Sequence, residues 1–167
     1  MLGGCADLEV VTYTDASLGT APRGRSVVAN LTKLCTQAGA VSAHTKATDV
    51  VFMSSFEAEL DGVSKGLKSS LRVRNVIHEL RQTLKGIPRL WSDNASMVKF
   101  VQGEGVAKGV RHMELRMWWV RERYKQGNVL VEWMKGADIP ADKLTKLGTR
   151  EEHDVFTRNV MGLGLVT

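Results

Sequence analysis

Three segments with strand character follow one another at the start of the chain, and this run constrains the fold more than any other feature. Residues 8–14 are rich in β-branched and aromatic side chains, and a turn-like stretch with Gly and Pro follows them. Residues 26–35 and 40–44 repeat the strand pattern on either side of Gly39. Strands joined by such short connections pair in antiparallel fashion, because parallel neighbours need a longer crossover. The first third of the chain is therefore predicted to form three antiparallel strands.

Helical and strand patterns alternate along the rest of the chain. Apolar residues at helical spacing predict one helix that begins at Ser54 or Ser55 and a second helix over residues 71–84. The later elements are expected in this order: a strand at 89–92, a helix after 94, a helix over 110–124, a strand at 129–134 and a helical region from 141. This order predicts a mixed sheet with flanking helices, as in an α/β or α+β domain.

Length and composition indicate one globular domain. A chain of 167 residues with 43% hydrophobic and 25% charged residues is neither collagen-like, low-complexity nor disordered. We expect a single domain over 1–167, with a core at about 8–147 and a C-terminal helical tail at 148–167. No apolar run approaches the roughly 20 residues of a membrane helix, and no secretory signal is visible. We therefore expect an intracellular protein without membrane contact, with reduced thiols at Cys5 and Cys35, which lack CxxC spacing.

The positive charge of the chain is regional. The net charge is +5, but residues 65–125 hold fourteen Lys/Arg against five Asp/Glu, so the remainder is acidic. A basic surface beside an acidic remainder is typical of a polyanion-binding protein with a separate cation pocket. A set of solvated helix faces explains the charge equally well. The charge pattern alone leaves both interpretations open.

Carboxylates stand at the junctions of the predicted elements. Asp15 ends the first strand, Glu59 lies in the first turns of the first helix, Asp93 follows the fourth strand and Asp142 opens the last helical region. The ends of neighbouring strands meet at one sheet edge, where ions and ligands bind. Carboxylates that converge there repel one another unless a cation lies between them. Oxygen ligands favour Mg²⁺ or Mn²⁺, and two such ions roughly 3.5 to 4 Å apart support phosphodiester hydrolysis.

Each of these carboxylates also has a purely local interpretation. Asp15 suits a turn, and Glu59 suits a solvated helix face. Asp93 suits an N-cap, and Asp142 suits the positive end of a helix dipole. No single carboxylate distinguishes a local structural role from a metal-binding role. The functional interpretation therefore depends on all four carboxylates together, in their order along the chain and beside the basic region.

Five short motifs place the carboxylates in a recognisable series. They are Tyr-Thr-Asp-Ala at 13–16, Ser-Ser-Phe-Glu-Ala-Glu-Leu at 54–60, Trp-Ser-Asp-Asn at 91–94, Arg-His-Met-Glu-Leu-Arg at 111–116 with Val-Arg-Glu at 120–122, and Ala-Asp-Lys-Leu-Thr-Lys at 141–146. As a series they resemble the ribonuclease H domain of copia-type LTR retrotransposon polyproteins. One departure from cellular ribonucleases H is the absence of a His from the loop at 136–140.

The resemblance implies a fold and an activity. The fold is an α/β one, a mixed five-stranded sheet with three antiparallel strands first. The implied activity is cleavage of the RNA strand of an RNA·DNA hybrid during retrotransposon reverse transcription. The implied catalytic and metal-binding residues are Asp15, Glu59, Asp93 and Asp142, with two Mg²⁺ ions that Mn²⁺ can replace. The expected partners are the hybrid and the reverse transcriptase domain of the same polyprotein, in the cytoplasm, a virus-like particle or the nucleus.

Residues of two kinds are candidates for substrate contact. Hydroxyl and amide side chains near the carboxylates have the chemistry to sense a 2′-hydroxyl, and they are Ser17, Ser55, Asn94 and Ser96. Basic or polar side chains of the charged region suit the phosphate backbone, and they include Lys108, Arg111 and His112. Trp133, in a predicted strand, is expected in the core.

Three other classes of protein remain open. One is a catalytically inactive, connection-type domain of the same fold that binds nucleic acid, although such a domain is expected to have lost carboxylates. Another is an integrase or transposase core, which normally ends in a catalytic Glu and not in the motif at 141–146. The third is a basic α/β protein without catalysis.

Overall fold

A five-stranded mixed sheet forms the centre of the molecule. We describe it from a computed structural model, and the description extends over residues 7–104, 113–146 and 148–162. The strands are β1 (Val11–Ala21), β2 (Arg25–Lys33), β3 (Ala40–Ala47), β4 (Arg89–Ser92) and β5 (Leu130–Trp133), in the spatial order β3-β2-β1-β4-β5. β1 pairs antiparallel with β2, and β2 with β3, while β4 runs parallel to β1 and β5 parallel to β4. The predicted run of three antiparallel strands is confirmed.

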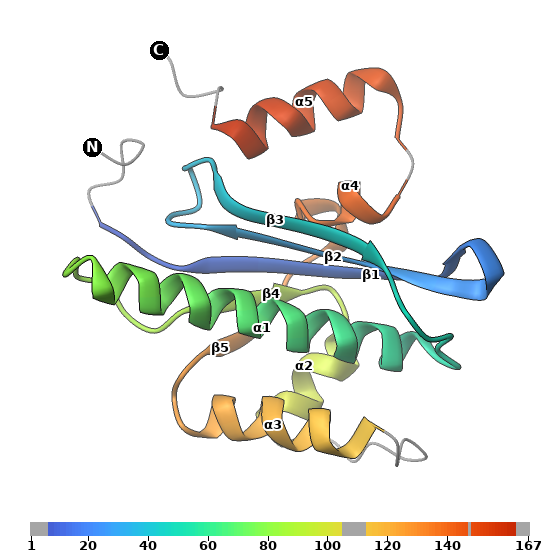
Figure 1. Cartoon of the computed structure of the whole chain (residues 1–167), viewed down its shortest axis with the longest axis horizontal. Helices are drawn as coiled ribbons and strands as arrows, with labels where there is room; N and C mark the ends of the chain where they lie inside the picture. Colours follow the sequence, from blue (N-terminus) through green and yellow to red (C-terminus); the bar gives the residue numbers. More distant parts are fainter. Residues whose placement is uncertain (1–6, 105–112, 147, 163–167) are drawn as a thin grey trace.

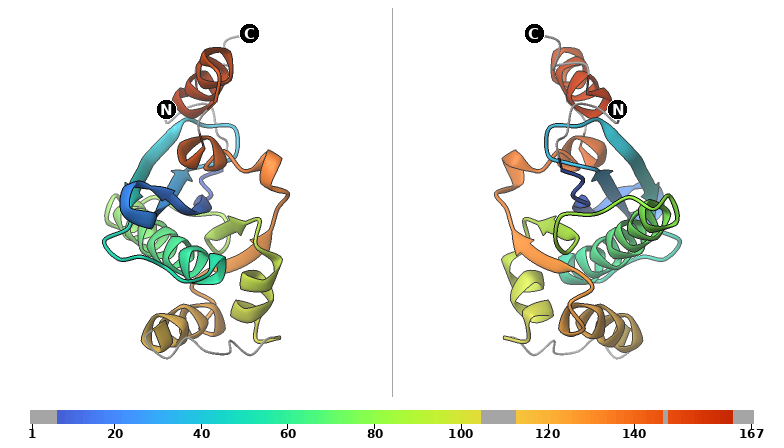
Figure 2. Two further views of the ribbon diagram at one scale, coloured as in Figure 1. Left: turned by 90° about the vertical axis from the view of Figure 1, so that its right-hand side faces the viewer. Right: turned by 90° about the vertical axis from the view of Figure 1, so that its left-hand side faces the viewer.

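Helices cover both faces of the sheet. They are α1 (Ser55–Glu79), α2 (Ala95–Gln102), α3 (Glu114–Lys125), α4 (Asp142–Thr145) and α5 (Arg150–Met161), with short 3₁₀ turns η1 (Pro22–Gly24) and η3 (Gly136–Asp138). α1, α2 and α3 lie on one side of the sheet, and α4 and α5 lie on the other (Figure 1). The two side views show the same layering (Figure 2). None of the helices in the described ranges has both the length and the apolar character that a membrane crossing needs.

The two helices predicted between Ser54 and residue 84 are one helix, α1. It begins at the N-cap Ser54, whose hydroxyl accepts a hydrogen bond from the Glu57 amide at 3.2 Å. It ends at Glu79, shortly before Arg81 takes a left-handed conformation with φ 54°. No Pro interrupts the segment, and the change of apolar register near residue 68 only moves the helix surface that is buried. The prediction of a break was therefore wrong.

Two glycines allow α1 to lie close to the sheet. A Cβ at Gly62 would stand 2.8 Å from Thr14 Oγ1, and a Cβ at Gly66 would stand 2.7 Å from Asn30 Oδ1. Both distances are too short for any side chain, so the helix axis approaches β1 and β2 more closely than another residue would permit. Glu59 precedes Gly62 by three residues and lies on the same helix face. The close approach therefore carries the Glu59 side chain to β1.

A separate apolar layer on the opposite face positions α4. Val11 and Tyr13 of β1 pack there with Ile139 and Ala141, the residues just before α4. Side chains two residues apart on a strand point to the same face, so Asp15 continues this series. The strand thus presents Asp15 towards α4.

Cys35, in the turn after β2, is disulfide-bonded. The expectation of a reduced thiol was therefore wrong for this residue. Spacing along the sequence identifies CxxC-type sites, but it carries no information about a pairing that depends on how distant segments pack.

Candidate metal centre

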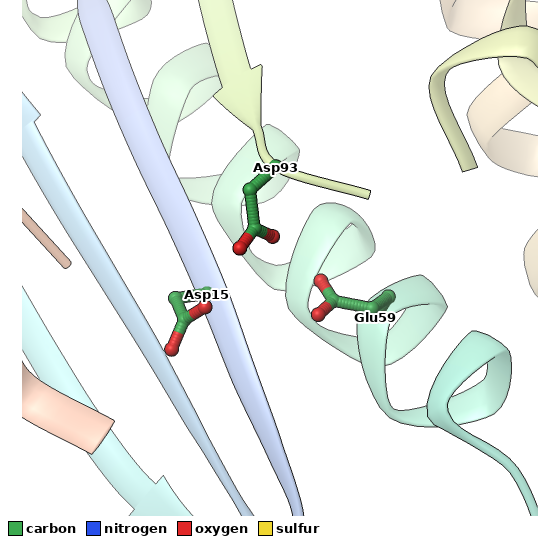
Figure 3. Close-up of side chains that lie close together, drawn as sticks. All are labelled: Asp15, Glu59 and Asp93. Carbon is green, nitrogen blue, oxygen red and sulfur yellow. The ribbon is translucent and has the colours of Figure 1, made fainter. Parts of the chain in front are cut away.

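Three carboxylates from different elements meet at one edge of the sheet. Within the described ranges, Asp15, Glu59 and Asp93 each offer a carboxylate oxygen, and these three oxygens lie within 4.8 Å of one another. Figure 3 shows the three carboxyl groups pointing toward one another from β1, α1 and the end of β4. The three residues come from the sequence motifs at 13–16, 54–60 and 91–94. The fold thus brings together side chains that stand up to 78 positions apart.

Asp15 and Glu59 do not have the local roles that their sequence positions also allowed. Asp15 lies inside β1, in register with Ala29 of β2, and is 3% exposed. It is therefore a buried strand residue and not part of a turn. Glu59 is 6% exposed, so it does not belong to a solvated helix face.

Asp93 is not the N-cap of α2. The N-cap is Asn94, whose Oδ1 accepts a hydrogen bond from the Met97 amide at 3.0 Å. The Asp93 carboxylate is free to turn toward Asp15 and Glu59, because its neighbour satisfies the helix end. Asn94 therefore caps the helix, and Asp93 joins the carboxylate group. The motif at 91–94 alone did not show which residue has which role.

The electrostatics of the three carboxylates favour a bound cation. Burial raises the pKa of Glu59 to about 9, and the charges on Asp15 and Asp93 add to this effect. Burial likewise raises the pKa of Asp15, in spite of a hydrogen bond from Thr145 that lowers it. Glu59 Oε2 is buried with no hydrogen-bond partner. A set of carboxylate oxygens with one orphaned oxygen fits Mg²⁺ or Mn²⁺, which take oxygen ligands.

Asp142 stands beside the three carboxylates and outside their group. It is the first residue of α4, with a side chain 14% exposed, and its Oδ1 forms an ion pair with Lys146. It is close enough that its negative charge helps to raise the pKa of Asp15. Its role as a fourth metal ligand stays a prediction.

Three further residues support the site, and sequence reasoning did not assign them to it. The Thr145 hydroxyl donates a hydrogen bond to Asp15 Oδ2. A Cβ at Gly136 would stand 2.8 Å from Asp93 Oδ2, so any other residue there would displace that carboxylate. The Trp133 indole N–H donates to the Asp93 carbonyl at 2.9 Å while the side chain is 53% exposed, so its prediction as a core residue was wrong. Thr145 belongs to the motif at 141–146, which is the one signal that pointed to it.

The candidate substrate-binding residues are only partly placed by the structure. Ser17 is half-buried on β1, Ser55 and Ser96 are exposed near the starts of α1 and α2, and Asn94 is occupied as a helix cap. Lys108, Arg111 and His112 lie outside the described residues. Substrate contact by all seven residues stays a prediction.

Part of the positive charge of region 65–125 is used inside the protein. Arg116 and Lys65 both pair with the buried Asp61, at 2.6 Å and 2.7 Å. Arg121 Nε donates to the Phe100 carbonyl at 2.7 Å. Arg116 and Arg121 hold α3 against α1 and α2, whereas Lys65 pairs within α1. The charge surplus therefore overstates the number of side chains available to a polyanion.

Comparison with known proteins identifies the fold. No protein-family model matches the chain, and no curated protein matches it. Among solved structures, the N-terminal RNase H domain of rv2228c from Mycobacterium tuberculosis matches with a TM-score of 0.61 at 15% identity, over 91% of this chain and 98% of that one. LC11-RNase H1 in complex with an RNA/DNA hybrid matches with a TM-score of 0.60 at 12% identity, over 81% and 93%.

A viral structure shows the same likeness within a larger chain. The foamy viral protease-reverse transcriptase in complex with an RNA/DNA hybrid matches with a TM-score of 0.59 at 11% identity, over 84% of this chain and 19% of that one. Likenesses at such low identity establish the fold alone. The protein has a ribonuclease H-like fold, as the sequence predicted.

Proposed function

We propose that this protein is a metal-dependent endonuclease that hydrolyses the RNA strand of an RNA·DNA hybrid. The observation that carries the proposal is the convergence of Asp15, Glu59 and Asp93, from three elements of a ribonuclease H-like fold, onto one buried point. Two of the matching structures are described as complexes with RNA/DNA hybrids, which supports this choice of substrate.

The side chains of this protein have distinct tasks in such a reaction. Asp15, Glu59 and Asp93 would hold the metal, with Asp142 as the proposed fourth ligand. A divalent cation bound there lowers the pKa of a water molecule and stabilises negative charge on the phosphate oxygens. Thr145 orients the Asp15 carboxylate through its hydrogen bond. Glu59 is protonated at neutral pH in the metal-free protein, so it must release its proton to become a ligand.

The protein is further proposed to act in retrotransposon reverse transcription, beside the reverse transcriptase domain of the same polyprotein. The series of motifs from 13–16 to 141–146 supports this origin, since it resembles that of copia-type elements. The likeness to a viral reverse transcriptase chain is consistent with the same context.

The direct test is cleavage of a hybrid whose RNA strand carries an end label. We expect cleavage with Mg²⁺ or Mn²⁺ and none after addition of a chelator, because the site uses oxygen ligands only. Double-stranded DNA should remain intact under the same conditions, because it lacks the 2′-hydroxyl that distinguishes RNA. Cleavage that persists in chelator would contradict the metal-dependent mechanism. Tight binding of the hybrid without cleavage at any metal concentration would instead favour the inactive, connection-type domain.

A further inference from the structure

One cation of the chain stands at the edge of the carboxylate cluster. Lys146 directly follows α4, and its Nζ pairs with Asp142 Oδ1 four residues earlier. The Asp142 side chain is only 14% exposed, whereas that of Lys146 is 56% exposed. The pair therefore joins a nearly buried anion to a cation that still has access to solvent.

The Lys146 ammonium group also interacts electrostatically with the neighbouring carboxylates. Besides its ion pair with Asp142, this group attracts the negative charges of Asp15 and Asp93 and that of an ionised Glu59. A single ammonium group thus partly offsets the negative charge of the carboxylate cluster.

A second lysine, Lys143, lies within α4 and faces elsewhere. Lys143 pairs with Glu152 of α5 at 3.3 Å, and its side chain is 43% exposed. Both lysines carry one positive charge, lie within four residues of each other and pair with a carboxylate. They differ in their partners: Lys146 pairs with Asp142, which lies beside the carboxylate cluster, whereas Lys143 pairs with Glu152 of α5.

On the basis of the proposed function, we propose that Lys146 is a positioning residue that holds Asp142 in the metal-free protein and competes with the divalent cation for it. In this arrangement the ammonium group reduces repulsion among the carboxylates while no metal is bound. Asp142 would become available as a ligand only when Lys146 leaves it. Lys146 consequently sets the metal affinity of the site.

The test compares the metal affinity of two charge-removing variants. Mn²⁺ is titrated calorimetrically into metal-free full-length wild type, Lys146→Met and Lys143→Met. We expect Lys146→Met to bind Mn²⁺ about three- to tenfold more tightly than wild type, because a partly exposed competing charge near the ion is removed. Lys143→Met is expected to stay within about twofold of wild type, because its charge lies farther away and is screened.

Further variants separate the competition from a general structural effect. Lys146→Arg retains the positive charge and should keep the affinity near that of wild type, and Lys146→Gln should repeat the result of Lys146→Met if the latter folds poorly. Equal affinity in wild type and both Lys146 variants that lack the charge, or an equal gain in Lys143→Met, would overturn the role of Lys146 while leaving the proposed function intact. A wild type that binds no Mn²⁺ would overturn both.

Discussion

Replacing Asp93 by Asn is expected to lower the rate of hybrid cleavage by at least about 100-fold while the protein keeps its fold. The amide has almost the shape of the carboxylate but lacks the negative charge that a hard divalent cation requires. The fold should persist, since Asn94 and not Asp93 caps α2. The Asp93 main-chain contact with Trp133 is also unaffected, because it uses the carbonyl oxygen of residue 93.

The matched control for this variant is Asp138→Asn. Asp138 is an exposed acid in η3, so its replacement changes the net charge equally but leaves the carboxylate cluster intact. Cleavage rates, circular dichroism and thermal unfolding of both variants provide the comparison. Asp138→Asn should remain within about twofold of wild type, as surface substitutions usually do. A folded Asp93→Asn protein with more than a tenth of wild-type activity would remove Asp93 from the site.

Much of the sheet was predictable because the strand patterns and the short connections between them are local features of the sequence. The three opening strands have short connections, which leave antiparallel pairing as the simple solution. Asp93 was predictable for the same reason, since it stands where a strand pattern ends. Asp15 was also expected at a strand end, but β1 continues past it to Ala21, so that part of the prediction was wrong. The convergence of Asp15 and Asp93 depends on the parallel pairing of β1 with β4, in which Tyr13 is in register with Trp91.

Features that depend on packing were not predictable from local patterns. α1 continues through Gly62 and Gly66, which lie close against the sheet, whereas isolated glycines in a helical pattern are otherwise signs of weakness. The contacts of Thr145 with Asp15 and of Lys146 with Asp142 depend on where a four-residue helix docks. The exposure of Trp133 reflects its position on β5, the edge strand of the sheet, which strand propensity does not reveal.

Replacing Glu59 by Gln is expected to stabilise the metal-free protein at neutral pH and to abolish its response to metal. The folded-state pKa of Glu59 is about 9, well above the ordinary value of 4.5 for this side chain. Between these two values the folded protein binds a proton that the unfolded chain has lost. Stability of the metal-free wild type therefore falls as pH rises through this window. Gln does not titrate, so the variant lacks this penalty and should gain about 3 kcal/mol in the free energy of unfolding near pH 7.

Urea unfolding of wild type, Glu59→Gln and Glu57→Gln from pH 5 to 9, with chelator and then with Mg²⁺, checks this expectation. Glu57 is a buried neighbour on α1, but its Oε2 accepts a hydrogen bond from the Met53 amide at 3.0 Å, so its replacement should bring no gain. The Glu59→Gln profile should be flatter with pH than that of wild type. Mg²⁺ should stabilise wild type and Glu57→Gln by mass action and leave Glu59→Gln unchanged, because that variant has lost a ligand. Parallel pH profiles for all three proteins would mean that the pKa of Glu59 is not raised in the folded protein. The electrostatic argument for a divalent cation at this site would then fail.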